Sequence, residues 1–118
     1  MAEAADEELE RDLERFRQEY RGKLPGKLAE LGELLRGARE APEAGGLEAA
    51  RRMAHTLKGT SGSYGFDELS AELRRIEEGL EGLIEEAPAD AWERIGHALA
   101  RARDALGPPP QPSSSHDA

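Results

Sequence analysis

Apolar residues recur at spacings of three and four along most of this chain, and this period constrains the fold more than any other feature. The N-terminal third carries them as one stripe, formed by Leu9, Leu13, Phe16, Tyr20, Leu24, Leu28, Leu31 and Leu35. Residues at these spacings share one face of an α-helix, whereas a half-buried strand alternates every second residue. Aromatic residues are only 4% of the 118, so leucine, isoleucine and alanine must supply the core. The pattern predicts an all-α fold.

Pro25 interrupts the N-terminal stripe without changing its register. Proline inside a helix breaks or kinks it at a cost of ~3 kcal/mol, because it lacks an N–H group and its ring meets the preceding turn. We therefore expect either one helix to about Arg21 and another from about Pro25 to Arg39, or one kinked helix. The unbroken stripe indicates packing on a single core, with the segment before Pro25 crossing or extending the bundle.

Three more helices are expected, at about residues 47–63, 67–86 and 88–106. The turn Tyr64-Gly65-Phe66 separates the first two, and the ring of Phe66 is expected to plug the bundle. Pro88 would occupy the first turn of the last helix, where its missing N–H group costs nothing. The predicted architecture is an antiparallel up-down four-helix bundle with an additional N-terminal helical segment.

The last residues differ in composition from the rest of the chain. Residues 1–106 are expected to form one domain. Residues 107–118 read Gly-Pro-Pro-Pro-Gln-Pro-Ser-Ser-Ser-His-Asp-Ala, which cannot build a core. This composition predicts a disordered tail or a linker to another module.

The overall charge and the lack of cysteine argue against several classes of protein. The formal net charge is −9, which is unfavourable for binding nucleic acid. There is no cysteine to form a disulfide or a thiolate metal site. No apolar run approaches the ~18 residues of a membrane span, and no signal peptide is visible. We therefore expect a cytoplasmic protein without a membrane segment.

The residues that carry chemistry lie in the stretch 54–66, Ala-His-Thr-Leu-Lys-Gly-Thr-Ser-Gly-Ser-Tyr-Gly-Phe. On a helix, His55 would point roughly 140° away from the centre of the apolar face. A neutral imidazole is a nucleophile near neutral pH, and Lys58, one turn later, could neutralise a phosphoryl group bound to it. Arg51 and Arg52, one turn earlier, add positive charge. This pattern suits phosphoryl carriage.

Two glycines, Gly59 and Gly62, follow His55 on the same outer face. A glycine on an exposed helical face costs up to ~1 kcal/mol relative to alanine, so both are expected to serve a purpose. A missing side chain lets the backbone of another protein approach the imidazole closely. The alternative interpretation is an ordinary solvent-exposed histidine on an amphipathic helix.

The stretch resembles the signature of histidine-containing phosphotransfer (HPt) domains, His-x-x-Lys-Gly-x-x-Gly-x-x-Gly, and the resemblance covers about residues 6–106. It implies that His55 accepts a phosphoryl group from a receiver-domain aspartate or from a sensor histidine kinase and passes it on. It also implies that Lys58 stabilises the phosphate and that Gly59 leaves room for the partner. No cofactor is expected on this chain, and Mg²⁺ is expected on the partner receiver domain.

Glu77 lies 22 residues after His55, on the next predicted helix. In the related phosphotransfer domain of chemotaxis kinases, a glutamate at this spacing hydrogen-bonds the imidazole, which implies an orienting role for Glu77. Those domains also carry a second histidine three residues before the glutamate, where this chain has Arg74. The alternative for Glu77 is a solvated helix glutamate.

The remaining histidines are not expected to act. His97 lacks a lysine or glycine partner, His116 lies in the tail, and three scattered histidines make no metal site. Two other functions compete with phosphotransfer: a docking bundle that is never phosphorylated, and a hydrolase with His55 as base. The retained His-x-x-Lys-Gly motif argues against the first, and the lack of a nucleophile in register argues against the second. We expect a carrier without an ATP site or autokinase activity, either a monomer or a module of a larger kinase.

Overall fold

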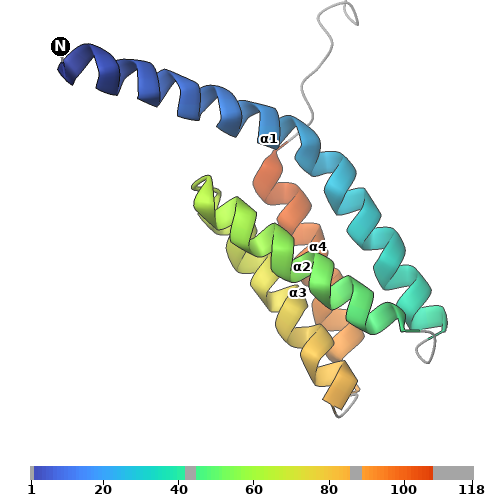
Figure 1. Cartoon of the computed structure of the whole chain (residues 1–118). Helices are drawn as coiled ribbons and strands as arrows, with labels where there is room; N and C mark the ends of the chain where they lie inside the picture. Colours follow the sequence, from blue (N-terminus) through green and yellow to red (C-terminus); the bar gives the residue numbers. More distant parts are fainter. Residues whose placement is uncertain (1, 42–44, 86–88, 108–118) are drawn as a thin grey trace, which may run out of the picture.

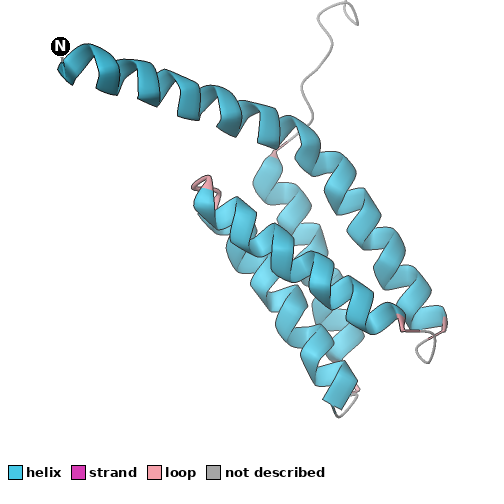
Figure 2. Cartoon of the chain, in the orientation of Figure 1, coloured by secondary structure: helices cyan, strands magenta, loops and turns pink. Residues whose placement is uncertain are grey.

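The computed structural model describes residues 2–41, 45–85 and 89–107. Four helices and no strand occupy these ranges: α1 Ala2–Glu40, α2 Gly46–Ser63, α3 Asp67–Glu85 and α4 Ala91–Leu106 (Figure 2). α1 packs against α2 and α4, and α3 packs against the same two helices. Successive helices run in opposite directions, so the four form an antiparallel bundle (Figure 1). The all-α bundle expected from the sequence is confirmed.

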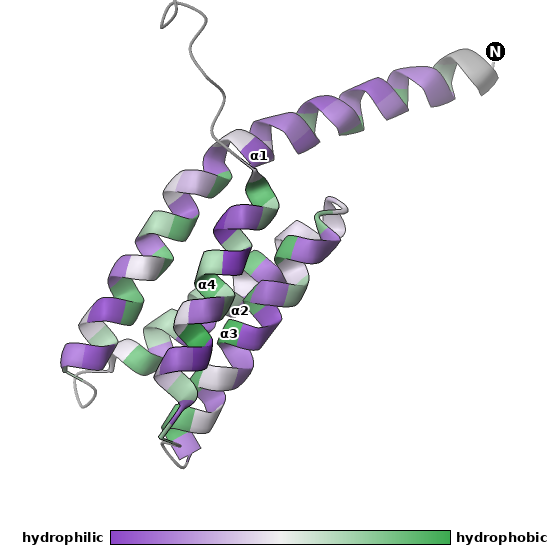
Figure 3. Ribbon diagram, turned by 180° about the vertical axis from the view of Figure 1, so that it is seen from behind, coloured by the Kyte–Doolittle hydropathy of each residue, from purple (hydrophilic) through white to green (hydrophobic). Residues whose placement is uncertain are grey.

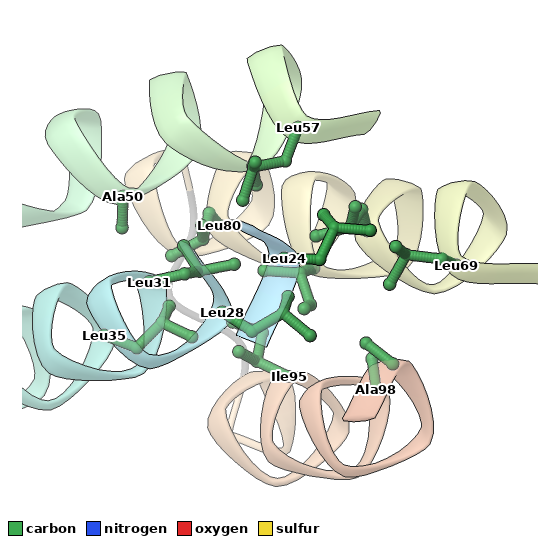
Figure 4. Close-up of a cluster of buried hydrophobic side chains, with 14 of the residues drawn as sticks. Leu24, Leu28, Leu31, Leu35, Ala50, Leu57, Leu69, Leu80, Ile95 and Ala98 are labelled. Atoms are coloured by element: carbon green, nitrogen blue, oxygen red, sulfur yellow. The ribbon is translucent and has the colours of Figure 1, made fainter. Parts of the chain in front are cut away.

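The core is aliphatic and draws on all four helices, as the low aromatic content requires (Figure 4). Its fully buried leucines and isoleucines are Leu24, Leu28, Leu31, Leu73, Ile76, Leu80 and Ile95. Small residues on the facing helices, such as Ala50, Ala54 and Ala98, let the helices approach each other around them. Each buried leucine or isoleucine contributes about 1.5–3 kcal/mol, so this repeated period supplies the driving force for the bundle.

A short turn between α2 and α3 places these two helices side by side. Gly65 adopts a φ of 83°, a left-handed conformation that favours glycine. The N–H of Phe66 donates to the carbonyl of Ser61, and the N–H of Tyr64 donates to that of Thr60, which closes the end of α2. The ring of Phe66 is half-buried and packs against the core. The turn therefore fixes α3 antiparallel to the helix that carries His55.

α3 and α4 approach closely at Gly79. A Cβ added there would lie 2.6 Å from Cγ1 of the buried Ile95, so any larger side chain would force the two helices apart. Gly79 does not stand out in the sequence, because the need for a missing side chain depends on which residue of α4 faces it. This contact sets the position of α3, which also carries Glu77.

α1 is one continuous helix with Pro25 inside it, so the expected end of a helix near Arg21 is wrong and the kinked helix is the form observed. Figure 1 shows that α1 changes direction in its middle third. The kink relieves the clash of the proline ring with the preceding helical turn, while Leu24 and Leu28, on either side of Pro25, remain buried in the core. Core packing on both sides of Pro25 outweighs its helix-breaking tendency.

The first half of α1 extends beyond the bundle. α1 has 39 residues and so spans ~58 Å, whereas the 19 residues of α3 span ~29 Å. The expectation that the whole apolar stripe packs on one core is therefore wrong at its start. Leu9, Leu13 and Phe16 are exposed because no other helix reaches them.

The last helix begins at Ala91, after Asp90 in the N-cap position. Pro88 lies outside the described residues, so its expected place in a first helical turn has no structural counterpart here. Gly107 ends α4 with a φ of 76°. Residues 108–118 are likewise outside the described part of the chain, and the tail stays a prediction.

Candidate functional site

α2 presents His55 to solvent on a helix whose opposite face is buried. Ala50, Ala54, Leu57 and Ser61 of α2 are buried against the bundle. The side chain of His55 lies away from them and is 61% exposed. Packing of the buried face holds the helix in place, so the imidazole is both accessible and fixed to a rigid support.

Glu77 of α3 contacts the imidazole from the buried side of the α2–α3 interface. Its side chain is only 8% exposed, and Oε2 lies 2.7 Å from Nδ1 of His55. An ionised carboxylate can only accept hydrogen bonds, so Nδ1 must carry the proton of this contact. In the neutral ring the lone pair then resides on Nε2, which is the nitrogen left free to react.

Lys58 binds the other oxygen of the same carboxylate. Its Nζ donates to Oε1 of Glu77 over 2.7 Å, and its side chain is 28% exposed. Burial by itself would raise the pKa of the Glu77 carboxyl. The hydrogen bonds from Lys58 and His55 outweigh burial and hold that pKa below its ordinary value, so Glu77 is ionised at neutral pH.

The structure thus joins three of the residues singled out in the sequence into one cluster, which we call the His55–Lys58–Glu77 cluster. Lys58 is expected from the sequence to contact the phosphate, yet in the unphosphorylated chain its ammonium group is bound to Glu77. That contact joins two helices and depends on how a long side chain turns. Sequence spacing alone therefore does not reveal it.

Ser70 is a residue of this region that sequence reasoning missed. Its hydroxyl donates to the carbonyl of Lys58 over 2.9 Å and ties α3 to α2 beside the cluster. A Cβ added at Gly62 would lie 3.3 Å from the same hydroxyl oxygen. Gly62 therefore gives α3 room to approach, in addition to any role it has toward a partner. The available signal was one small polar residue among the larger side chains of α3.

Gly59 is the open position next to the cluster. It is exposed, and a Cβ added to it would meet nothing within 4 Å. Lys58, Gly59 and Gly62 line one wall of a shallow groove between α2 and α3, and Ser70 and Arg74 line the other. The glycines thus leave an indentation beside the face of α2 that carries His55.

The two arginines before His55 differ in their contacts. Arg51 makes two hydrogen bonds to Glu48 within α2, and its side chain is 27% exposed. Arg52 is exposed and forms no ion pair with the described residues. Arg74, at the position of the second histidine of chemotaxis domains, pairs with Glu78 on the surface over 3.4 Å.

The other histidines lie apart from the cluster. His97 is exposed on α4, beside Arg94 and Arg101, in a groove on the α3–α4 side of the bundle. His116 falls outside the described residues. No group of three or more metal-ligating side chains occurs in the described ranges. None of the helices described there is long and apolar enough to cross a membrane.

Comparison with known families agrees with this geometry. The family model of the Hpt domain matches residues 7–106, which is most of the chain and includes all four helices except the first residues of α1. The chain therefore belongs to the Hpt domain family, the histidine-containing phosphotransfer domains of phosphorelay signalling. Its role is histidine phosphotransfer, and members of this family are phosphoryl carriers. No similar protein was found among curated proteins or solved structures.

Proposed function

We propose that His55 is the phosphorylated residue and that it exchanges its phosphoryl group with an aspartate of a response-regulator receiver domain, or accepts it from a sensor histidine kinase. The observation that carries this proposal is the contact of Nδ1 with the buried, ionised Glu77 on an otherwise exposed histidine. In the neutral ring this contact places the lone pair on Nε2, on the side away from the carboxylate. An exposed nucleophilic nitrogen of fixed orientation is what a protein-to-protein relay requires.

In the transfer from a receiver, the Nε2 lone pair attacks the phosphorus of the aspartyl phosphate. An Nε2–P bond forms, the P–O bond to the aspartate breaks, and the aspartate leaves as a carboxylate. No proton has to move, because Nδ1 keeps the hydrogen that it donates to Glu77. The ring becomes cationic in this step, and the negative charge of Glu77 stabilises it over a distance of 2.7 Å. The reverse reaction uses the same contacts.

Lys58 is proposed to stabilise the phosphoryl group once it has arrived. Before transfer, Lys58 is the positive partner of Glu77. After transfer, the imidazole itself is positively charged and can take over that role. Lys58 can then turn toward the phosphoryl oxygens without leaving a buried carboxylate uncompensated. Its side chain is 28% exposed, which leaves it room for such a change.

The residues around the cluster are proposed to form the docking surface for the receiver domain. Gly59 and Gly62 would give clearance to the receiver backbone, and Arg51 and Arg52 would contact its acidic surface. The receiver would supply Mg²⁺ and most of the catalysis, because the His55–Lys58–Glu77 cluster offers only a nucleophile and one mobile cation. We infer that the domain by itself neither binds ATP nor phosphorylates itself. We also propose that the relay takes place in the cytoplasm.

The test is to incubate the protein with phosphorylated receiver domains and to follow phosphate on both chains. The label should be acid-labile and base-stable, as expected of a P–N bond. It should vanish in His55→Gln and persist in the matched control His97→Gln, which changes a second exposed helical histidine. Labelling that survives in His55→Gln would refute the assignment. Receiver binding without any labelling of the wild-type chain would instead support a docking bundle.

A further inference from the structure

The N-terminal half of α1 carries an apolar surface that nothing in the bundle covers. We call residues 5–20 the N-terminal arm. Leu9, Leu13 and Phe16 are 57%, 54% and 46% exposed, and together they form the arm's seam. Figure 3 shows the arm as a largely hydrophilic helix that extends beyond the other three. Large apolar side chains lined up at a helical period on such an extension indicate a contact surface.

The bundle supports the arm only at its root. Tyr20 stacks on Tyr64 with ring centroids 4.9 Å apart, and the guanidinium of Arg17 lies 4.3 Å from the ring centre of Phe66. Arg17 also donates to the carbonyl of Tyr64 over 2.9 Å. Residues 5–16 are all exposed, and no hydrogen bond or ion pair joins them to another helix of the described chain. A free helical segment of this length is marginal in water, and most helices in proteins are stabilised by packing of their apolar face. We therefore infer that the seam packs against another molecule.

The distribution of charge along α1 identifies a partner. Residues 5–10 contain four carboxylates and no basic residue, namely Asp6, Glu7, Glu8 and Glu10. Residues 11–23 contain five basic residues against three acidic ones, and the basic ones are Arg11, Arg15, Arg17, Arg21 and Lys23. In the antiparallel register that places Leu9 opposite Phe16, residues 6–10 of one arm lie opposite about residues 15–19 of the other, where Arg15 and Arg17 outnumber Glu19. Two parallel copies would bring the acidic tips together, which is unfavourable.

The position of the bundle also favours the antiparallel orientation. The seam belongs to the stripe that continues through Tyr20 to Leu24 and Leu28, and these residues face the bundle. Bundle and seam thus lie on the same side of α1. A parallel pair of arms would place both bundles at one end, in the space between the two helices. An antiparallel pair separates the bundles to opposite ends of the contact.

We propose that two copies of this chain associate through their N-terminal arms in an antiparallel pair, with the seams of Leu9, Leu13 and Phe16 facing each other. Leu13 lies near the twofold axis, and Leu9 lies opposite Phe16 of the partner subunit. This pairing differs from the monomer, which was one of the two states expected from the sequence. The seam is small, so the association is concentration-dependent, with a dissociation constant on the order of micromolar. It does not rest on phosphoryl transfer, because it uses no residue of the His55–Lys58–Glu77 cluster.

Sedimentation equilibrium of the whole chain tests the association. The mean mass should rise from one chain toward two as the protein concentration increases from about 1 to about 300 μM. Leu13→Glu should raise the dissociation constant at least about tenfold without changing the melting behaviour of the bundle, because Leu13 is exposed in the single chain. Ile84→Glu is the matched control, since Ile84 is 44% exposed on α3, away from the arm, and it should leave the association unchanged. A wild-type chain that stays monomeric throughout, or equal effects of the two substitutions, would overturn the proposal.

Charge reversal tests the orientation. Antiparallel pairing predicts that the double variant Glu7→Lys, Glu8→Lys associates more weakly, because the reversed tip then lies opposite basic residues of the second copy. Association that strengthens in this variant would show the acidic tips to be adjacent and would overturn the antiparallel arrangement. If Leu13→Glu instead slows phosphotransfer from a receiver while every variant is monomeric, the seam binds the receiver and not a second copy.

Discussion

Replacing Glu77 by glutamine tests the central contact of the candidate site. The substitution keeps the size of the side chain and removes its charge. In the present geometry that charge accepts hydrogen bonds of 2.7 Å from both Nδ1 of His55 and Nζ of Lys58. Glutamine offers one acceptor oxygen for these two donors, and it cannot stabilise a positively charged ring. Both the tautomer of His55 and the charge that develops during transfer should be affected.

The magnitude follows from the bond that is weakened. A hydrogen bond to a charged group is worth about 1.5–3 kcal/mol. His55 is 61% exposed, so water screens part of this, and the lower end of the range applies. A loss of about 1.5 kcal/mol in the transition state slows transfer about tenfold. The effect on folding at neutral pH should be smaller, because Lys58 can turn its ammonium group to solvent once the carboxylate is gone.

The assay measures two quantities on the same variant. Single-turnover transfer from a phosphorylated receiver gives the rate, and ¹⁵N chemical shifts of the imidazole report which ring nitrogen carries the proton. Glu77→Gln should slow transfer and reduce the population with hydrogen on Nδ1. Glu78→Gln is the control, because Glu78 neighbours Glu77 in sequence but is exposed and, among the described residues, pairs with Arg74 on the surface. Unchanged transfer in Glu77→Gln, or an equal loss in the control, would refute an orienting role for this carboxylate.

Three further predictions concern the surroundings of His55. Lys58→Ala should slow phosphotransfer, and calorimetry should show a stability loss of about 1–3 kcal/mol, because it removes a donor from a buried carboxylate; an unchanged rate would assign Lys58 to Glu77 alone. Gly59→Gln should keep or raise the melting temperature, since nothing lies within 4 Å of the added Cβ, yet it should slow transfer from a receiver at least about tenfold. Labelling by phosphoramidate, a small donor, should be slowed less. If the variant and the wild-type chain accept phosphate from the receiver at equal rates, docking takes place elsewhere. Folding lowers the pKa of Glu77, so its stabilisation is present above the ordinary value of 4.5 and is lost as the pH falls through the lowered folded-state pKa. Urea unfolding between about pH 7 and 3 should show this loss, and Glu77→Gln should flatten the slope; an unchanged slope would contradict the assignment.

The order and limits of the helices could largely be predicted from the sequence, because apolar spacing and glycine or proline punctuation act locally. The predicted boundaries of the His55 helix, at 47 and 63, differ from those of α2 by one residue at most. Pro25 was harder, because its local preference for a break competes with burial of Leu24 and Leu28 by distant helices. The exposure of Leu9 and Leu13 could not be predicted either. It depends on the lengths of the neighbouring helices and not on the stripe itself.

The candidate site likewise has a part that could be predicted from the sequence and a part that could not. The spacing of His55, Lys58 and Gly59 within one helix can be read directly from the sequence, because residues three and four apart share a helical face. Glu77 entered through the family resemblance and not through a physical rule. The bond of Ser70 to the Lys58 carbonyl, and the direction in which Lys58 turns, depend on the packing of α3 on α2. Contacts between helices are the part of the site that cannot be predicted from a single sequence.

The contrast in burial across the cluster explains how an exposed histidine can remain oriented. Exposure falls from 61% at His55 to 28% at Lys58 and 8% at Glu77, so the carboxylate is fixed by the bundle while the ring it orients faces solvent. Two hydrogen bonds offset the cost of burying Glu77, and both come from α2. The orientation of the His55 ring therefore depends on the register between α2 and α3, which the turn at Gly65 and the Ser70 hydroxyl maintain. In the proposed transfer the donor approaches Nε2, and Glu77 holds the ring from the side of Nδ1, so the orienting contact leaves the proposed reacting nitrogen open to different partners.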